Sequence, residues 1–424
     1  MGDDSGTLAT PVTIKGATPA RAVPLWSVLL AILLLALTLR TAVTALSPLL
    51  PRVAQEVPLS PTQVGLVGAL PPICFAVAGV LGPVLLRRWA AERVVLLALV
   101  LAAVGQLWRP WTGGAQAFMV TSVIALLGMG VGNVVLPVLV KAWFPGRIAR
   151  VTGLYVVVLT VGSAVPALTA VPVAEAVRSS GGPGAPGWQL AVASWGAVSL
   201  LVVLPWLLPA GAPRASPPGA DGEPRVRLPL WRSRRAWGLA CLFGATSLTT
   251  YAMWAWLPTR LTEAGLGEAS AGGVLAIFTV MGVPAAIAVP RLVARTTHHA
   301  ALTAQFAASF ALGEIGFLLS PTRGTVLWAV LAGWGSGAFP LALTLIGVRS
   351  RTHTTAGALS GFVQSIGYTF AGLGPVVVGA LREVTGGWTA SFAVLVAAGG
   401  LMVLGGRLAG GPGTVDDDLA RLAW

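Results

Sequence analysis

The sequence predicts an all-α membrane protein with twelve transmembrane helices arranged in two pseudo-symmetric six-helix halves. Its composition, the lengths of its apolar runs and an internal repeat each point to this fold class. Of the 424 residues, 55% are hydrophobic and only 10% are charged, with a mean hydropathy of +0.83. A soluble domain carries about 25% charged residues. The chain therefore has too little polar surface for water, which excludes soluble enzymes and nucleic-acid-binding domains despite a net charge of +13.

The apolar runs are long enough to cross a bilayer, which takes about 20 mainly apolar residues per helix. The first six predicted spans are 25–47, 62–86, 94–109, 115–140, 151–176 and 189–209. The second six are 236–257, 269–290, 300–319, 324–347, 355–380 and 388–408. A Pro-, Gly- and Arg-rich stretch, 210–235, reads as a linker between the halves. The predicted organisation is a tail at 1–24, six-helix bundles at 25–209 and 236–409, and a second tail at 410–424.

The two halves resemble each other in sequence. A shift of 207 residues places Glu56 on Glu263, and a shift of 205 places Gly162 on Gly367. The same 205-residue shift superposes Gly128, Gly130 and Gly132 on Gly333, Gly335 and Gly337, and the tryptophan that opens span six, Trp188, recurs as Trp388. Parallel six-helix halves of this kind are the architecture of major facilitator transporters. The matched glycines have the spacing that lets helix backbones approach closely.

The distribution of basic residues predicts the orientation, because cytoplasmic loops are enriched in Lys and Arg. Twenty of the 27 basic residues lie in the tails, the linker and the loops of one side. The opposite side has Arg52, Arg109, Arg178, Arg260, Arg323 and Arg382. We therefore expect both termini and the linker in the cytoplasm of a multi-pass protein of the bacterial cytoplasmic (inner) membrane.

The remaining basic residue, Arg40, lies inside span one and is the first candidate for a substrate contact. A charge at mid-helix costs about 2.5–3.5 kcal/mol on insertion scales, so something must offset it. On a continuous helix, Arg40, Thr44 and Ser47 share one stripe. The 207-residue shift carries that stripe to span seven, which contributes Tyr251 and Trp254. A cation facing hydroxyls and aromatic rings suits a small anion or a polar planar molecule; the alternative is a structural arginine that snorkels outward or pairs locally.

Other spans bring further polar side chains to the expected cavity. The candidates are Asn133 on span four, Tyr155 on span five, and Gln364 and Tyr368 on span eleven. For Asn133 and Gln364 the alternative is a hydrogen bond between helices, since amides commonly join helices in membranes. Trp256 is expected to face lipid or the interface belt.

Glu314 is the single acidic residue well inside a span, and intramembrane carboxylates are candidates for proton relays. It lies on span nine, an outer supporting helix of this architecture, so a protonated or locally paired glutamate is the alternative. The three histidines fall in predicted loops. No metal cluster, phosphate-binding loop or nucleophile–His–Asp arrangement is present in the sequence. We therefore expect no enzyme activity, no cofactor, no metal and no nucleic-acid partner.

Four stretches resemble the cyanate and 2-nitroimidazole permease family of the major facilitator superfamily. They are LRTAVTALSPLLP (39–51), GVGNVVLPVLVKAWFPGRIARVTGLY (130–155), YAMWAWLP (251–258) and LSGFVQSIGYTFAGLGP (359–375). The resemblance implies a secondary transporter of small solutes, with cyanate-like anions or nitroimidazole-like heterocycles as substrates. The general superfamily motif departs from the usual pattern, because Arg87 and Arg88 occupy the stretch where an aspartate usually lies.

The expected function is secondary active transport by alternating access. The expected partners are a small-molecule substrate and the lipid bilayer, with a coupled proton as a candidate. One alternative is a proton-driven multidrug exporter, which calls for an acidic residue lining the cavity. An alternative from another class is a transporter-fold membrane sensor or receptor, which calls for a longer cytoplasmic domain.

Overall fold

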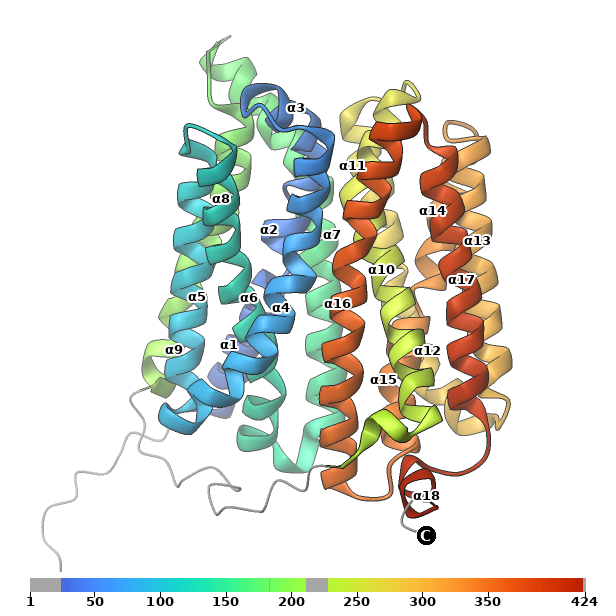
Figure 1. Ribbon diagram of the computed structural model, residues 1–424. Coiled ribbons are helices and arrows are strands. Elements are labelled where there is room, and N and C mark those ends of the chain that lie inside the picture. The colour runs from blue at the N-terminus through green and yellow to red at the C-terminus, as the bar shows by residue number, and fades with distance from the viewer. Residues whose placement is uncertain (1–23, 183, 211–227, 422–424) are drawn as a thin grey trace, which may run out of the picture.

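The computed structural model describes residues 24–182, 184–210 and 228–421. The first tail and most of the linker expected from the sequence lie outside these ranges. The described residues form helices and no strand, in two bundles that stand side by side with parallel helix axes (Figure 1). The two ends of the bundles are here called the α3 face, which carries α3 and the α7–α8 connection, and the α18 face, which carries α18 (Figure 1).

The first half contains the six spans expected from the sequence, two of them interrupted. Its elements are α1 (Leu25–Thr38), α2 (Thr41–Thr44), η1 (Ser47–Leu49), α3 (Leu50–Glu56), α4 (Pro61–Arg88), α5 (Ala91–Trp108), η2 (Arg109–Trp111), α6 (Ala115–Trp143), η3 (Pro145–Arg147), α7 (Ile148–Gly181), α8 (Gly187–Leu201) and α9 (Val203–Ala210). Span one comprises α1 to α3, and span six comprises α8 and α9.

The second half also contains six spans, with the interruptions in spans eight and ten. Its elements are η4 (Leu230–Arg232), α10 (Arg234–Glu263), α11 (Glu268–Val280), α12 (Gly282–Arg295), α13 (His299–Leu319), α14 (Thr325–Gly335), α15 (Ala338–Val348), α16 (His353–Thr385), α17 (Thr389–Gly410) and α18 (Val415–Ala420). Span eight comprises α11 and α12, and span ten comprises α14 and α15. Eleven segments among the described residues are long and apolar enough to cross a membrane. The twelfth span is α10, whose Thr246, Ser247 and Thr249 are buried in the protein and therefore do not meet lipid.

Span one is broken, which corrects the continuous helix expected at 25–47. Helix α1 ends at Thr38, and α2 starts only after Arg40, whose backbone (φ −127°, ψ −6°) is not helical. The hydroxyls of Thr38 and Thr41 donate to the carbonyls of Leu35 and Thr38 at 2.9 and 3.0 Å, bonds that compete with the helix ladder. Further along, Pro48 lies in the one-turn helix η1, where its ring cannot donate to the ladder.

The internal repeat corresponds to the same contacts made in both halves. The indole nitrogen of Trp188 donates to the Glu56 carboxylate at 2.7 Å, and that of Trp388 donates to the Glu263 carboxylate at 2.8 Å. In each half, a tryptophan at the start of the sixth helix thus ties it to the end of the first. The repeat inferred from these residues is confirmed at the level of their hydrogen bonds.

The matched glycines mark close helix contacts. A Cβ on Gly162 of α7 would lie 2.0 Å from the carbonyl oxygen of Leu37 in span one. A Cβ on Gly367 of α16 would lie 2.2 Å from the Phe243 ring in span seven. Both contacts join the fifth helix of a half to its first helix, and both leave no room for a side chain.

The two halves meet tightly at the α3 face. Arg52 of α3 forms ion pairs with Glu175 of its own half and with Glu268 of the other, and Thr62 donates to Glu383 across the same boundary.

Gly65 and Gly68 of α4 pack directly against α16 and α10, with Pro375 as a shared neighbour. Among the described residues, the Arg52–Glu268 ion pair, the Thr62–Glu383 hydrogen bond and the Ser47 contact described below join the halves toward the α3 face.

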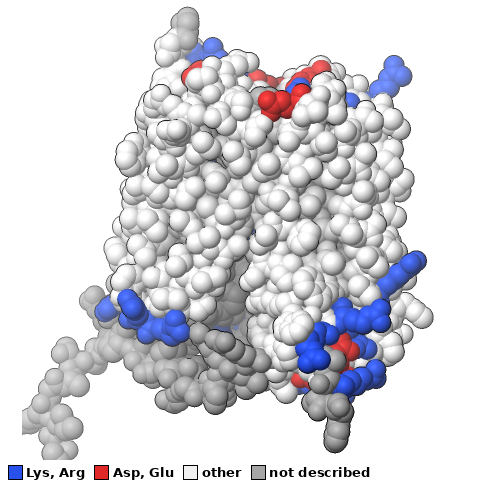
Figure 2. Space-filling model, in the orientation of Figure 1, with Lys and Arg blue, Asp and Glu red and all other residues white. Residues whose placement is uncertain are grey.

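Toward the α18 face the halves diverge. A Cβ on Gly79 of α4, or on Gly357 or Gly361 of α16, would meet no heavy atom of the described residues within 4 Å. Figure 2 shows the surface hollowed between the halves on this side, and it shows basic side chains collected around the α18 face. As far as residues 24–182, 184–210 and 228–421 are concerned, the structure is therefore closed at the α3 face and open at the α18 face.

The C-terminal segment forms part of the second half. Asp418 of α18 accepts hydrogen bonds from Ser233 and pairs with Arg235, and Asp416 accepts from Thr355 at 2.6 Å. These contacts place α18 beneath α10 and α16. The stretch expected as a tail at 410–424 thus includes a helix that joins the ends of three spans, since the N–H of Val415 also donates to the carbonyl of Arg349 at 2.8 Å.

Candidate substrate chamber

Arg40 lies at the break in span one, between the two halves. Its side chain is 7% exposed, and the centre of its guanidinium lies 4.6 Å from the Phe75 ring of α4. Its Nη1 is buried without a hydrogen-bond partner, and no carboxylate of the described residues forms an ion pair with it. The guanidinium is therefore neither turned to lipid nor neutralised by the protein.

Aromatic side chains from both halves surround this cation. Tyr368 of α16 and Tyr251 of α10 both lie within electrostatic reach of Arg40, and Tyr368 is within reach of a hydrogen bond to it. Tyr368 packs edge-on against Phe75 and Phe243, with ring centroids 6.4 and 5.2 Å apart. The result is a chamber with a cationic centre, aromatic walls and hydroxyl groups.

Thr44 and Ser47 do not line this chamber on one stripe with Arg40, because the helix is broken. The Thr44 hydroxyl donates to the backbone carbonyl of Arg40 at 3.2 Å. The Ser47 hydroxyl donates to the backbone carbonyl of Trp254 across the boundary between the halves. Thr44 thus stabilises the turn that carries Arg40, and Ser47 joins spans one and seven on the α3 side of the chamber.

The remaining predicted residues lie on three helices, α6, α7 and α16. Asn133 of α6 and Tyr155 of α7 are half-buried and make no hydrogen bond through their side chains to any described residue. Gln364 of α16 is half-buried and donates to Ser360 of its own helix at 2.7 Å. Neither of the two amides, Asn133 and Gln364, forms the alternative bond between helices among the described residues.

Trp254 lies beside Tyr251 with ring centroids 5.2 Å apart and the rings nearly perpendicular. Its indole nitrogen is buried without a partner. Trp256, expected at the lipid interface, is instead 5% exposed and donates to the carbonyl of Pro375 at 2.8 Å. That expectation was wrong because the Trp256 side chain packs against Pro375 of α16 and against the Trp388 ring instead of lipid.

Glu314 lies outside the chamber. It is 1% exposed on α13, a helix that packs mainly against α14 and α17, and its Oε1 has no hydrogen-bond partner. His299, expected in a loop, starts this same helix at the α18 face, is 6% exposed and places its Nδ1 2.9 Å from the guanidinium of Arg349.

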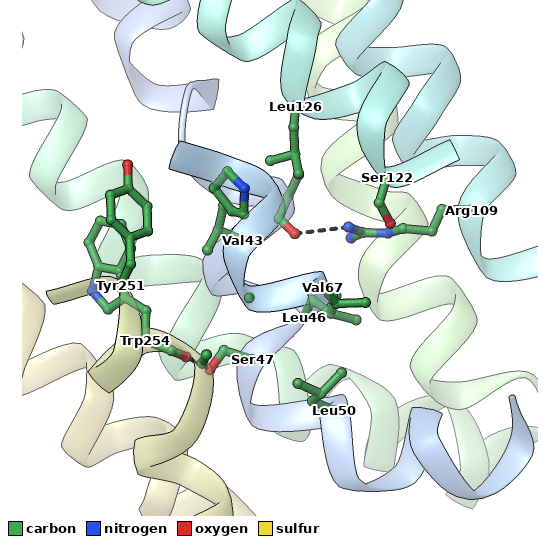
Figure 3. Close-up of a pocket in the computed structure, with 14 residues that line it drawn as sticks. Val43, Leu46, Ser47, Leu50, Val67, Arg109, Ser122, Leu126, Tyr251 and Trp254 are labelled. Atoms are coloured by element: carbon green, nitrogen blue, oxygen red, sulfur yellow. Dashed lines mark hydrogen bonds between the residues drawn. The ribbon is translucent and has the colours of Figure 1, made fainter. Parts of the chain in front are cut away.

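Arg109, expected in a loop, is instead a second buried arginine. Arg109 starts η2 at the end of α5 and is 1% exposed. Its Nη1 donates to the carbonyl of Ala42 at 3.0 Å (Figure 3). The sequence signal for this burial was the position of Arg109 directly after an apolar run, between Trp108 and Pro110. The loop prediction was wrong because η2 turns inward at this point.

The two six-helix bundles, the broken first span and the chamber between the halves define the class: a secondary transporter that exposes one central site in turn to each side of a membrane. The sequence pattern described as the Major Facilitator Superfamily matches residues 32–372. The chain belongs to that superfamily, and within it to the cyanate and 2-nitroimidazole permease family.

The relatives that place it in this family are similar along most of their length. The chain is 32% identical to the 2-nitroimidazole transporter of Escherichia coli (strain K12) over 380 residues, 89% of this chain and 94% of that protein. It is 28% identical to the cyanate transport protein CynX of the same organism over 383 residues, 90% and 97% of the two chains. The protein is accordingly a transporter and not an enzyme.

Solved structures show the same fold at lower identity. A bacterial homolog of the human lysosomal transporter Spinster, in an inward-facing and occupied conformation, superposes with a TM-score of 0.71 at 17% identity and covers 96% of both chains. This likeness supports the two-bundle arrangement. The relatives named above are transporters of small solutes, so the alternatives of a proton-driven multidrug exporter and of a transporter-fold sensor or receptor are not favoured.

Proposed function

We propose that the protein carries a small anionic or electron-rich solute, cyanate-like or nitroimidazole-like, and that Arg40 binds it in the chamber. The observation that supports this most directly is the buried guanidinium of Arg40, which has a free N–H, aromatic neighbours and no carboxylate partner. A solute with a negative charge, or with a nitro group, offers the acceptor that the protein itself does not supply. Tyr251 and Tyr368 are the hydroxyls placed to share it.

The other candidate contacts extend this site toward the opening. Asn133, Tyr155 and Gln364 present polar groups along the route from the chamber to the α18 face, and Trp254 closes the chamber on the α3 side. Thr44 acts indirectly, through the turn that carries Arg40. Ser47 acts as a link between the halves and releases when the α3 face opens.

The basic residues around the α18 face support a cytoplasmic location for it, and for both termini, in a bacterial inner membrane. The closed α3 face then corresponds to an inward-facing state. A cytoplasm-negative potential opposes entry of an anion by about 2.3 kcal/mol per 100 mV. Uptake of an anion therefore needs a coupled proton or an exchange partner, whereas export is electrically downhill, and we propose export or exchange.

The experiment is transport by the purified chain in proteoliposomes. Radiolabelled cyanate and 2-nitroimidazole are measured separately, with and without an imposed pH gradient and with and without unlabelled solute on the opposite side. We expect exchange of at least one of the two at equal rates under both pH conditions. Transport of neither solute above empty liposomes would contradict the proposed substrate class, and dependence on the gradient would contradict simple exchange.

A further inference from the structure

Arg109 is a second buried cation without a counter-charge. One of its three guanidinium nitrogens, Nη1, donates to the carbonyl of Ala42, while Nε and Nη2 are buried with no hydrogen-bond partner. The Phe118 ring lies 5.7 Å from the guanidinium, and no carboxylate of the described residues pairs with it. A lone charge in an apolar interior is strongly unfavourable unless a group of opposite charge accompanies it.

The bond to Ala42 accounts for one nitrogen only. In a continuous helix the carbonyl of Ala42 would accept from the N–H of residue 46, and the break in span one leaves that bond unmade. Gln106, one turn before Arg109, accepts from the hydroxyl of Thr41 at 3.1 Å. The end of α5 thus holds α2 in place. These contacts still leave the Nε and Nη2 groups of the charged Arg109 side chain without a hydrogen-bond partner.

These two N–H groups belong to a side chain that lines a cavity of about 30 Å³ between span one, α4 and α6 (Figure 3). The walls near Arg109 are Val43, Leu46, Val67 and Leu126, which are apolar, and the hydroxyl of Ser122 is already donated to the carbonyl of Phe118 at 2.7 Å. One water needs about 10–15 Å³ by this measure, so the cavity has room for about two or three heavy atoms.

The cavity shares one wall residue, Tyr251, with the chamber of Arg40. Tyr251 and Trp254 line its far end, and Tyr251 also lies within electrostatic reach of Arg40. The short helix α2 lies between the two arginines, since Arg40 precedes it and Ala42 within it accepts from Arg109. Two uncompensated guanidiniums therefore flank one broken segment, and the described residues supply no carboxylate to either.

We propose that the Arg109 cavity is a second anion-binding subsite, which takes a monovalent anion of two or three heavy atoms on the α3 side of Arg40. A water molecule in the cavity would leave the charge uncompensated, whereas a small anion beside Arg109 would supply the opposite charge. The subsite provides a stopping point between the α3 face and the chamber, a role that rests on the proposed function. Binding of an anion there does not rest on it.

The test uses azide, a linear three-atom anion isoelectronic with cyanate that does not modify amines. Thermal unfolding of the purified full-length chain is followed in sodium azide against sodium gluconate at equal ionic strength, because a ligand that binds the folded state raises Tm with its concentration. The Arg40→Ala variant isolates the second site. We expect it to keep an azide-dependent rise in Tm, which Arg40→Ala combined with Arg109→Met loses and Arg40→Ala combined with Arg109→Lys retains in part.

A second pair of variants keeps the proposal falsifiable if Arg109→Met does not fold. Val67→Leu adds a methylene to the cavity wall and leaves Arg109 intact, and Val80→Leu makes the same change on an exposed part of α4. In the Arg40→Ala background we expect Val67→Leu to abolish the azide effect and Val80→Leu to preserve it. The proposal is overturned if azide stabilises no form of the protein, if Arg40→Ala alone removes the effect, or if the cavity variants leave it unchanged.

The outcome is independent of the transport assay. If cyanate and 2-nitroimidazole are not carried, yet Arg40→Ala keeps an azide effect that depends on the cavity, the substrate class fails and the subsite stands. If transport requires Arg40 while azide binding does not depend on Arg109 or Val67, the subsite fails and the proposed function stands.

Discussion

Arg40 is held where a charge in a membrane protein is expensive, by contacts that offset only part of the cost. The penalty on insertion scales is about 2.5–3.5 kcal/mol at a helix centre, and a cation over an aromatic ring recovers about 0.5–2 kcal/mol. Phe75 supplies that ring, and Tyr368 supplies a hydroxyl within reach. The unused Nη1 is the part of the charge that remains for a solute.

Substitution of Glu314 tests whether this residue couples transport to protons. Because it is buried on α13, outside the chamber, we expect a protonated carboxyl group that glutamine can replace without loss. Glu314→Gln should therefore retain solute exchange in proteoliposomes and the response of the parent chain to a pH gradient. Loss of a gradient response that the parent possesses would identify Glu314 as the coupling group instead.

At the scale of the helices, the sequence was sufficient to predict number and order. The length of the apolar runs predicted the spans. It also predicted α10, because the polar residues of this helix do not interrupt its apolar run. The breaks were not found. Hydropathy does not register the Thr38 and Thr41 hydroxyls that compete with the ladder, or the effect of Pro48, so Arg40, Thr44 and Ser47 were expected on one stripe.

The candidate site was also predicted only in part. Arg40 was recognisable as a charge inside a span, Tyr251 as the residue that the repeat places beside it on span seven, and Tyr368 as a polar aromatic residue of span eleven. Arg109 was missed because its role depends on the inward turn of η2 and on a carbonyl freed by the break in a different span. Such a partner is visible only in three dimensions.

The close contact between α7 and α1 gives a prediction with an internal control. Gly162→Ala places a methyl group against the carbonyl of Leu37, and overpacking of this kind costs about 1–3 kcal/mol. Gly153→Ala, in the same helix, meets nothing within 4 Å and should stabilise the chain by up to about 1 kcal/mol through helix propensity. Thermal unfolding of both variants measures the difference, and equal Tm values would refute the assigned contact.

Across the whole molecule, closure of the α3 face depends on a few polar links and on helix packing. Arg52→Ala removes the ion pair to Glu268 that joins the halves. A partly exposed pair is worth up to about 1 kcal/mol, so the ratio of open to closed α3 faces should rise by up to about fivefold.

Double electron–electron resonance would report this shift as a change in the distance between two spin labels. The labels are attached at Gln55→Cys and Thr322→Cys, in a chain with Cys74 and Cys241 replaced by alanine. Arg291→Ala is the matched control, since its side chain bonds within its own helix at the α18 face. A longer-distance population that grows in Arg52→Ala and not in Arg291→Ala is the expected result. Identical distance distributions in the two variants would mean that the Arg52–Glu268 ion pair does not help to close the α3 face.

The most direct test of the account is exchange of the carried solute by Arg40 variants beside Arg323→Ala, an exposed arginine of the α13–α14 loop. A hydrogen bond to a charged group is worth about 1.5–3 kcal/mol, so Arg40→Ala should lower exchange by about tenfold to more than a hundredfold. Arg40→Lys should retain part of the activity, and Arg323→Ala should match the parent. Exchange by a folded, membrane-inserted Arg40→Ala chain at the parent rate would contradict the assignment of the chamber.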